Sequence, residues 1–409
     1  MDFNDTPKEA AFRAEARAWL AATLKPQDAS AVVRIEDAEG LAAAKVYQAK
    51  KAGAGFAGIT WKKEHGGRGL APVFQVIFSQ EEAKYDAPIS PFSIGLGMCI
   101  PTMIAFASDA QKARHVGPAL RGEEIWCQLF SEPAAGSDVA GLKTRAVKEG
   151  DDWIVNGQKV WTSGAHYSDF GILLTRTNPE KEKHKGLTMF FLDMKSPGVD
   201  VRPIHQMSGG TNFNEVYFKD VRIPDAQRLG EVGAGWNVAL VTLMNERLAV
   251  GGIGGPDYRE MLELARRTPA ANGAGGLLQD QAFRERLALW YVHARGYELG
   301  KFRTLTALSR GQTPGPESSI GKILNAARLQ DITNCAIEAE DHYGVIVDPD
   351  LAPMAAVFQS SFLWAPGLRI AGGTDEILRN ILAERVLGLP QDARADKGVA
   401  FKDLPSGRF

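Results

Sequence analysis

The chain has 409 residues, of which 44% are hydrophobic and 23% are charged, and its formal net charge is −2. This length suits two or three globular domains, and the near-neutral charge argues against nucleic-acid binding and against a polybasic membrane anchor. The three cysteines and seven histidines show neither CxxC spacing nor the spacing of metal ligands. We therefore expect no disulfide framework and no metal site, and a reducing, cytoplasmic location.

Helical patterns fill residues 6–120. Thr6 is a candidate N-cap, and Pro7 occupies the first position of the first helix. Further helices are expected at residues 40–54 and 72–85, on either side of a glycine-rich connector.

One stretch in this region, residues 87–108, carries no charge and has the length of a membrane span. Pro88, Pro91 and Pro101 interrupt it, and charges are dense on both flanks. Because proline breaks a helix interior, this pattern favours a pair of buried helices. The N-terminus also lacks the apolar segment of a secretory signal, so we expect no membrane association.

Short β-type runs replace the helical pattern between residues 123 and 232. Turn residues bound them, such as those at residues 149–151 and the pair Asn156 and Gly157. Runs of this number and length predict a compact antiparallel barrel or sandwich. The expected strands lie within residues 125–133, 152–164, 169–177, 186–194, 199–204 and 214–224.

Helical patterns return after Gly235, so the order along the chain is α, β, α, without an internal repeat. The expected helices are residues 235–252, 281–311, 318–344 and 374–388. The expected domains are a helical domain at residues 1–122, a β domain at 123–232, a helical domain at 233–390 and a polar tail at 391–409.

The helix that begins near residue 235 carries two charged residues on or at the edge of its apolar face. Arg247 falls near the middle of that face and Glu246 at its edge, and no cation lies three or four residues from Glu246. Such groups are costly on a packing face unless they are paired or solvated. They indicate an ion pair with another helix, a face that reaches the surface, or a general base with a pKa raised by desolvation. At 100° per residue, the apolar face consists of Trp236, Ala239, Leu240, Leu243 and Val250.

Two segments of the β region combine small polar residues with open backbone. The first, residues 129–144, either contacts a polar ring or phosphate or is an ordinary turn capped by Ser137. In the second, Trp161 precedes Thr162 and Ser163. Its indole either stacks on a flat cofactor or fills the core.

Residues 370–377, IAGGTDEI, open the last clear helix. Thr374 is a natural N-cap, and Asp375 and Glu376 complement the positive end of the helix. The free N–H groups at this helix start could also bind a pyrophosphate. A helix cap and a phosphate site both remain open.

Taken together, five segments resemble the acyl-CoA dehydrogenase family in their order and spacing. The resemblance runs from about residue 5 to residue 390. It implies an α+β multidomain fold with an N-terminal helical domain, a middle antiparallel β-barrel and a C-terminal four-helix bundle, assembled as a homotetramer or heterotetramer. The segments are FSEPAAGSDVAGLKT (130–144), VNGQKVWTSGA (155–165), NEVYFKDVRIP (214–224), GEVGAGWNVALVTLMNER (230–247) and IAGGTDEILRNILAERVLGLP (370–390).

The resemblance implies a bound FAD between the barrel and the helices. It also implies an acyl-CoA substrate that loses an α-proton and a β-hydride, with the carbonyl polarised by the N–H of Gly372. The implied FAD contacts are Phe130, Ser131, Trp161, Thr162, Ser163, Thr374, Asp375 and Glu376. The implied substrate contacts are Ser137, Arg247, Gly372 and Gly373.

The chain departs from the commonest family pattern at Gly372. Many members carry the catalytic glutamate at this position, in a Tyr-Glu-Gly-Thr motif. Here we expect the base to be Glu246, as in the members similar to isovaleryl-CoA and long-chain dehydrogenases and to bacterial two-gene dehydrogenases of steroid side chains. The missing side chains at residues 371 and 372 also leave room for a branched, cyclic or otherwise bulky acyl group.

A second departure concerns a Gly-Gly-x-Gly turn of the family's FAD site. Asp341 and His342 replace two of its glycines, and Gly344 matches the third. In two-gene dehydrogenases some FAD half-sites are lost, so this departure allows a heteromeric partner.

From these features we expect an FAD-dependent acyl-CoA dehydrogenase of fatty acid metabolism, with the chemistry of beta-oxidation. Its electrons are expected to pass to an electron-transfer flavoprotein. Two other interpretations remain open. One is another flavin reaction on the same fold, such as that of an oxidase or a desulfinase, and the other is a non-catalytic subunit that completes a partner's FAD site.

Overall fold

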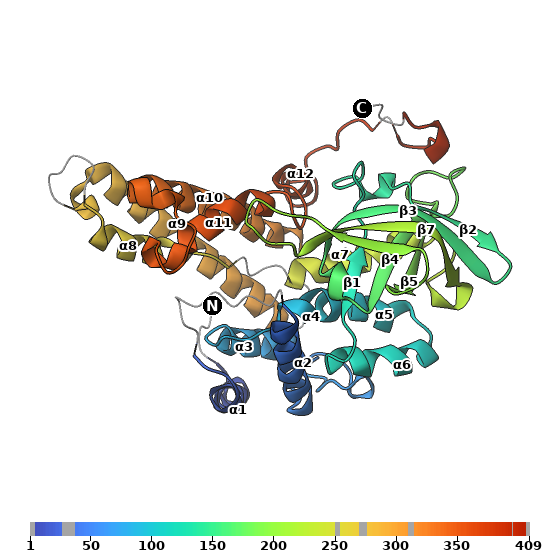
Figure 1. Cartoon of the computed structure of the whole chain (residues 1–409), viewed down its shortest axis with the longest axis horizontal. Helices are drawn as coiled ribbons and strands as arrows, with labels where there is room; N and C mark the ends of the chain where they lie inside the picture. The colour runs from blue at the N-terminus through green and yellow to red at the C-terminus, as the bar shows by residue number, and fades with distance from the viewer. Residues whose placement is uncertain are drawn as a thin grey trace. The chain divides into compact units, whose positions relative to one another are not determined.

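The computed structural model describes residues 5–26, 37–249, 254–269, 276–309, 315–394 and 396–405 (Figure 1). The chain divides into two compact units. The sheet unit consists of Val33–Leu70, Ala87–Ala249 and Gln391–Phe409. The helical unit consists of Met1–Val32, Ala71–Asp86 and Val250–Pro390.

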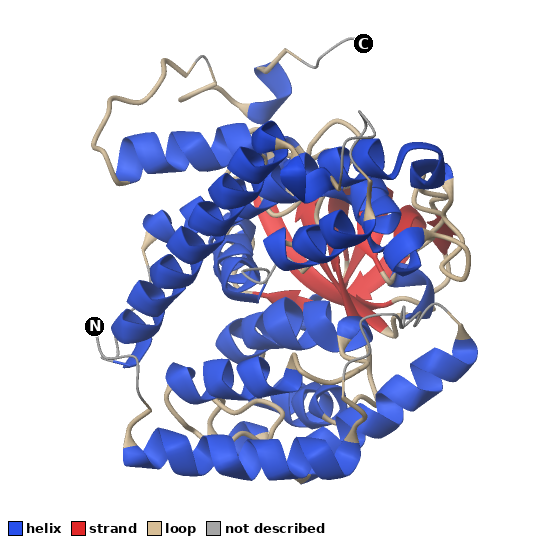
Figure 2. Cartoon of the chain, turned by 90° about the vertical axis from the view of Figure 1, so that its left-hand side faces the viewer, coloured by secondary structure: helices blue, strands red, loops and turns tan. Residues whose placement is uncertain are grey.

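The strands of the sheet unit form a single eight-stranded sheet (Figure 2). Their order is β6-β7-β3-β2-β4-β5-β8, and β1 pairs with β4. Most neighbours are antiparallel, as expected, but the β1–β4 and β2–β4 pairs are parallel, so the sheet is mixed. The strands are β1 (Trp126–Leu129), β2 (Arg145–Glu149), β3 (Asp152–Ser163), β4 (Phe170–Arg176), β5 (Leu187–Asp193), β6 (Val199–Pro203), β7 (Phe213–Pro224) and β8 (Arg228–Leu229).

The predicted turn at Asn156 and Gly157 is wrong, because both residues lie inside β3. Gly157 has φ +152°, and β3 shifts its register against β7 there. A Cβ at this position would lie 2.5 Å from Oγ1 of Thr144. The glycine therefore allows β3 to pass close to the segment at Thr144, and this packing outweighs the local turn signal.

Helices pack against this sheet through one apolar core. It joins residues of the helical stretch before the sheet, of the sheet and of α7, among them Met103, Trp126, Phe191, Val238 and Ala239. Residues 90–106 are helical throughout, with a π turn directly before Pro101. None of the described helices is both long enough and apolar enough to span a membrane. The helices are α2 (Ala38–Gly53), α4 (Ser90–Ile94), the π turn η2 (Gly95–Cys99), α5 (Ile100–Phe106), α6 (Asp109–Leu120) and α7 (Gly235–Ala249).

The helical unit has a separate core, in which α8 to α11 pack together (Figure 1). Met261, Trp290, Ile332 and Phe358 lie in it, one from each helix. Thr6 caps the first helix as predicted, in a reciprocal capping box. The sequence patterns did not single out α8 or α11. The helices are α1 (Pro7–Thr23), α3 (Pro72–Glu82), α8 (Tyr258–Arg267), α9 (Gln281–Ser309), α10 (Ser319–Glu340), α11 (Val357–Leu368) and α12 (Asp375–Arg385).

Candidate active site

A bulge in β3 presents an indole ring outside the sheet. The register of β3 against β7 shifts between Lys159 and Thr162, and Trp161 lies in this bulge with φ +59°. A positive φ is rare for a bulky residue and marks a constrained backbone. The indole is 58% exposed, and its ring contact is edge-on with Phe213. Trp161 is therefore not a core tryptophan, and its flat face is available to a planar ligand.

The other sheet residues predicted to meet a flavin lie beside this bulge. The main-chain N–H of Val160 donates to the carbonyl of Ser131 at 2.9 Å, which joins the end of β1 to the bulge. The side chain of Phe130 is buried in the core, so only its backbone is placed for such a contact. The hydroxyl of Thr162 is buried and has no hydrogen-bond partner in the described part of the chain.

Ser137 is exposed in the loop that follows β1. Its neighbour Asp138 pairs with Lys183 at 2.9 Å, and Lys183 also pairs with Asp396 of the C-terminal tail at 2.5 Å. Lys183 therefore links the tail to the loop that carries the predicted acyl-CoA contact.

The IAGGTDEI segment forms a tight turn and a capped helix start. Gly372 and Gly373 have φ of +66° and +92°, values that residues with a side chain rarely adopt. Thr374 accepts a hydrogen bond from the N–H of Ile377 at 3.2 Å, so the N-cap is confirmed. Glu376 is exposed in the first turn of α12.

Asp375 differs from the neighbouring acid because it is fully buried. Its carboxylate is paired with Lys322 at 3.2 Å and with Arg369. The contacts of Asp375 are thus internal, and it shapes the turn rather than offering free acceptors. Lys322 and Arg369 were not found from the sequence. Lys322 lies 53 residues from Asp375, beyond any local pattern, and Arg369 lies 6 residues from it, outside the three- and four-residue spacing of helix pairs.

Glu246 and Arg247 lie in the last turn of α7, and their side chains fall outside the described residues. The buried positions of α7 include Val238, Ala239 and Thr242. Glu246 follows Thr242 by four residues, which places it on the same face of the helix. The predicted apolar face was partly wrong. Leu240 is exposed, because the face that packs on the sheet and on α5 is rotated toward Val238 and Thr242.

The position of the expected Gly-Gly-x-Gly turn is a 3₁₀ turn, η8 (Asp341–Val345). Asp341 has φ +51° and ψ −123°, a conformation that glycine adopts far more readily. The backbone therefore keeps the shape of a glycine turn while carrying side chains. Beside it, burial raises the pKa of Glu340 to about 7, and Gln359 donates a hydrogen bond to this carboxyl group.

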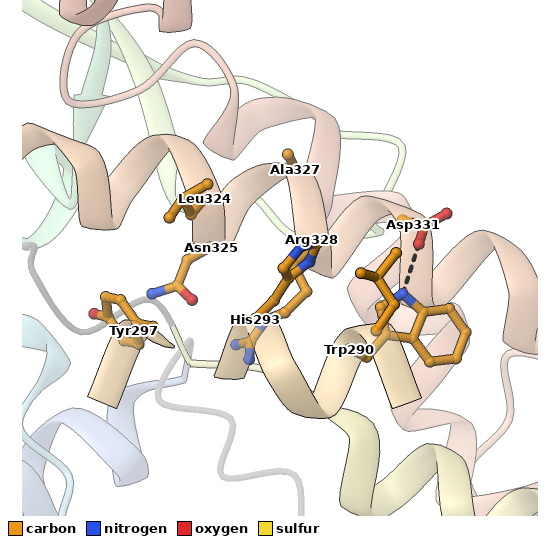
Figure 3. A pocket seen from close by; sticks show the side chains of 9 residues that line it. Trp290, His293, Tyr297, Leu324, Asn325, Ala327, Arg328 and Asp331 are labelled. Carbon is orange, nitrogen blue, oxygen red and sulfur yellow. Dashed lines mark hydrogen bonds between the residues drawn. The ribbon is translucent and has the colours of Figure 1, made fainter. Parts of the chain in front are cut away.

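A hollow of about 220 Å³ lies between α9 and α10, away from all predicted site residues (Figure 3). Asn325 and Arg328 point from α10 toward α9, where Tyr297 and His293 lie. The Nε of Arg328 is buried without a hydrogen-bond partner among the described residues. Leu289 and Leu324 line this hollow and are exposed, and other large apolar side chains are exposed elsewhere on the two helices, namely Tyr291, Val292, Leu299 and Ile320.

Models of the N-terminal, middle and C-terminal domains of acyl-CoA dehydrogenases match residues 6–123, 127–221 and 233–387. The chain belongs to the acyl-CoA dehydrogenase family. The resemblance seen in the sequence and the fold class it implied are thereby confirmed. As a family member, the protein is an FAD-dependent oxidoreductase that dehydrogenates acyl-CoA thioesters.

Individual acyl-CoA dehydrogenases resemble the chain over nearly its whole length. Acyl-CoA dehydrogenase IpdE1 of Mycobacterium tuberculosis is 37% identical over 94% of this chain and 98% of its own. The solved ChsE4-ChsE5 complex from Mycobacterium tuberculosis is 29% identical, with a TM-score of 0.77 over 96% of this chain and 100% of the matched chain. The Tcur3481-Tcur3483 steroid ACAD is 25% identical, with a TM-score of 0.81 over the same shares.

The described residues of this acyl-CoA dehydrogenase fit FAD. The constrained bulge exposes the ring of Trp161, and the hydroxyl of Thr162 lacks a protein partner. Planar aromatic side chains stack on flat rings, and an unpaired buried hydroxyl is stabilised by a ligand hydrogen bond.

Proposed function

We propose that this dehydrogenase uses Glu246 as the base that removes the α-proton of the acyl-CoA. Gly372 has no side chain, and its φ of +66° would disfavour one. We infer that the Glu246 carboxylate is desolvated when the acyl-CoA is bound, which makes it a stronger base than it would be in water. Arg247, Gly373 and the N–H of Gly372 would bind the thioester, and the N–H would polarise its carbonyl.

The single observation that carries the proposed flavin chemistry is the exposed indole of Trp161 on its constrained bulge. It supports a flavin ring at the edge of β3, beside Phe130, Ser131, Thr162 and Ser163. When bound there, FAD supplies the acceptor for the hydride that leaves the β-carbon. Thr374 and Glu376 would hold the phosphate side of the cofactor, with Asp375 acting through the turn.

Ser137 would contact the acyl-CoA from its exposed loop. We further propose a bulky, ring-containing or branched acyl group. The small residues Ala371 and Gly372, in place of the Tyr and Glu of many family members, support this, as does the steroid ACAD among the similar structures. The same enzyme would act in beta-oxidation in the cytoplasm and pass electrons to an electron-transfer flavoprotein.

A tetramer that contains a second kind of dehydrogenase subunit is the assembly we propose. Exposed apolar residues on α9 and α10 support a protein interface there, since patches of this kind mark association sites. Asp341 and His342 support a heteromer, because their side chains occupy a turn that glycines form elsewhere in the family. The ChsE4-ChsE5 complex is an assembly of two different chains.

The specific observation at Asp341 also favours a second candidate function, that of a subunit without catalysis that completes the FAD site of a partner. One experiment separates the two. Purified protein is mixed anaerobically with a panel of straight, branched and ring-containing acyl-CoAs, and flavin absorbance is followed. Bleaching by bulky acyl-CoAs supports the dehydrogenase. A colourless protein that stays colourless with added FAD supports the non-catalytic subunit, and rapid reoxidation by O₂ supports an oxidase.

A further inference from the structure

We propose that Glu132 and Lys159 act as positioning residues for the flavin ring, by clamping the end of β1 to the bulge of β3. This inference rests on the proposed flavin placement beside Trp161. Neither residue carries a predicted role from the sequence. The two side chains are buried and lie 2.8 Å apart, measured from Nζ of Lys159 to Oε1 of Glu132.

Lys159 is 0% exposed and makes two hydrogen bonds to the end of β1. Its ammonium group donates to Glu132 and, at 3.0 Å, to the carbonyl oxygen of Phe130. Lys159 is also the last residue of β3 before the bulge that carries Trp161. The same ammonium therefore fixes both segments that are expected to face the flavin.

Glu132 ties this contact to a third segment of the chain. Its carboxylate accepts the main-chain N–H of Lys143 at 2.6 Å and that of Thr144 at 2.9 Å. A buried ion pair rarely adds stability, because desolvation offsets its attraction, but it restricts geometry when all its hydrogen-bonding groups are satisfied. This pair makes four hydrogen bonds in the described contacts, so the ammonium of Lys159 donates two and the carboxylate of Glu132 accepts three.

The bulge needs such a restraint, because the backbone at Trp161 has φ +59°. Hydrogen bonds hold it on both sides: the N–H of Val160 donates to the carbonyl of Ser131, and the side-chain amide of Asn214 donates to the carbonyl of Thr162. Without the ammonium, the carbonyl of Phe130 would be buried and unpaired, and the β1 end would move to solvate it. The indole and the backbone of Ser131 would then lose their mutual position.

The charge of Lys159 itself provides a way to loosen the clamp. Burial lowers the pKa of Lys159 to about 8, although Glu132 raises it, and the nearby Arg176 lowers it further. The ammonium of the folded protein is therefore protonated at pH 7 and largely neutral at pH 9. A flavin held by this clamp responds to that change in the wild-type protein.

The alternative is a clamp that only stabilises the sheet. Removing such a clamp would lower the unfolding temperature but leave the flavin of the folded fraction unchanged. Positioning, in contrast, predicts an altered visible flavin band and weaker FAD retention in protein that is still folded. The test therefore reads the flavin spectrum and FAD retention rather than turnover.

The experiment compares Lys159→Met, Glu132→Gln and the double variant with wild type, as purified holoprotein. The double variant leaves no unpaired charge, so it retains the fold best. We expect its FAD dissociation constant to rise at least ~10-fold and its flavin band to approach that of free FAD. Lys195→Met is the matched control, because Lys195 forms an exposed ion pair with Asp169 at 3.1 Å in the same unit. It is expected to behave as wild type.

A folded double variant with wild-type FAD affinity and flavin band would overturn the proposal. If no clamp variant folds, the wild-type holoprotein decides the matter. Its flavin band must then change reversibly between pH 7 and pH 9, and a constant band would overturn the proposal. Trp161→Ala distinguishes this failure from failure of the flavin placement. If Trp161→Ala leaves FAD binding unchanged, the proposed flavin placement is contradicted. If Trp161→Ala weakens FAD binding and the clamp variants do not, only the positioning role of Glu132 and Lys159 is contradicted.

Discussion

Lys322 donates a hydrogen bond to the main-chain oxygen of Gly373 at 2.9 Å, across the start of α12. The same ammonium reaches the carbonyl of Arg369 and the carboxylate of Asp375, each at 3.2 Å. These three bonds tie the main-chain oxygens before and within the glycine turn, and the carboxylate of Asp375, to one ammonium group. The shape of the proposed carbonyl-polarising turn is thus set by a residue on a different helix.

We predict that Lys322→Met destabilises the protein by about 3 kcal/mol, because it removes one of the two cationic partners of the buried Asp375 carboxylate. FAD retention should also weaken, since the turn that orients Thr374 loses its main anchor. Urea unfolding and flavin fluorescence on dilution measure the two effects. Lys301→Met, an exposed lysine of α9, is the control. Equal stability of the two variants would contradict the anchoring role.

We predict that the titration of Glu340 makes the free energy of unfolding depend on pH. Burial raises its pKa from 4.5 to about 7, so the folded state holds a proton that the unfolded state releases above pH 4.5. The free energy of unfolding therefore falls as pH rises from 4.5 to 7, and it stays low above pH 7. Glu340→Gln should abolish this loss, which amounts to roughly 3 kcal/mol.

The measurement is urea unfolding of wild type and Glu340→Gln at several pH values. Glu338→Gln, an exposed position on the same helix, is expected to follow wild type. A constant difference between wild type and Glu340→Gln from pH 4.5 to 7 would show that Glu340 titrates normally.

Gly157→Ala should destabilise the sheet by about 1–3 kcal/mol, because the new methyl group would lie 2.5 Å from Oγ1 of Thr144. Gly136→Ala is the control, since a Cβ there meets nothing within 4 Å and the residue has no positive φ. Thermal unfolding of the two variants is compared. If Gly157→Ala and Gly136→Ala unfold at the same temperature, the close approach of β3 to Thr144 does not exist in solution.

The C-terminal tail is held to the sheet unit by a contact between Phe401 and Arg176. This arginine is buried, its pKa is lowered to about 10 by burial, and the ring of Phe401 lies 3.7 Å from its guanidinium. Phe401→Ala should cost about 2 kcal/mol and release the tail, because a desolvated cation–π contact is lost. Faster proteolytic cleavage after residue 390 reports the release. Lys402→Ala removes only an exposed pair with Glu180 and should leave cleavage unchanged.

Local signals predicted much of this fold. The cap at Thr6 and the cap at Thr374 follow from residue type, and six of the strands follow from short β-type runs, whereas β2 and β8 were not among the expected strands. Long-range contacts were beyond such signals. Lys322 meets Asp375 and Lys159 meets Glu132 only because the fold brings distant segments together.

Tertiary packing also overrode local patterns in two places. Asn156 and Gly157 have the signature of a turn, but Gly157 instead lets β3 pass close to Thr144. α11 contains Pro366, a residue that argues against a helix in the sequence. In the structure it follows left-handed residues at Met354 and Ala355. Trp161 was left open between core and cofactor. Its exposure removes the core interpretation, and its contact with FAD stays a prediction.

The most direct test of the proposed chemistry is Glu246→Gln, which keeps the size of the side chain but cannot accept a proton. Holoprotein is mixed anaerobically with an acyl-CoA that bleaches the wild-type flavin, and the bleaching rate is measured. The variant should bind FAD normally but bleach at least ~100-fold more slowly, the usual contribution of a general base. Glu231→Gln, an exposed position before α7, should bleach at the wild-type rate. Bleaching of Glu246→Gln at the wild-type rate would contradict Glu246 as the base.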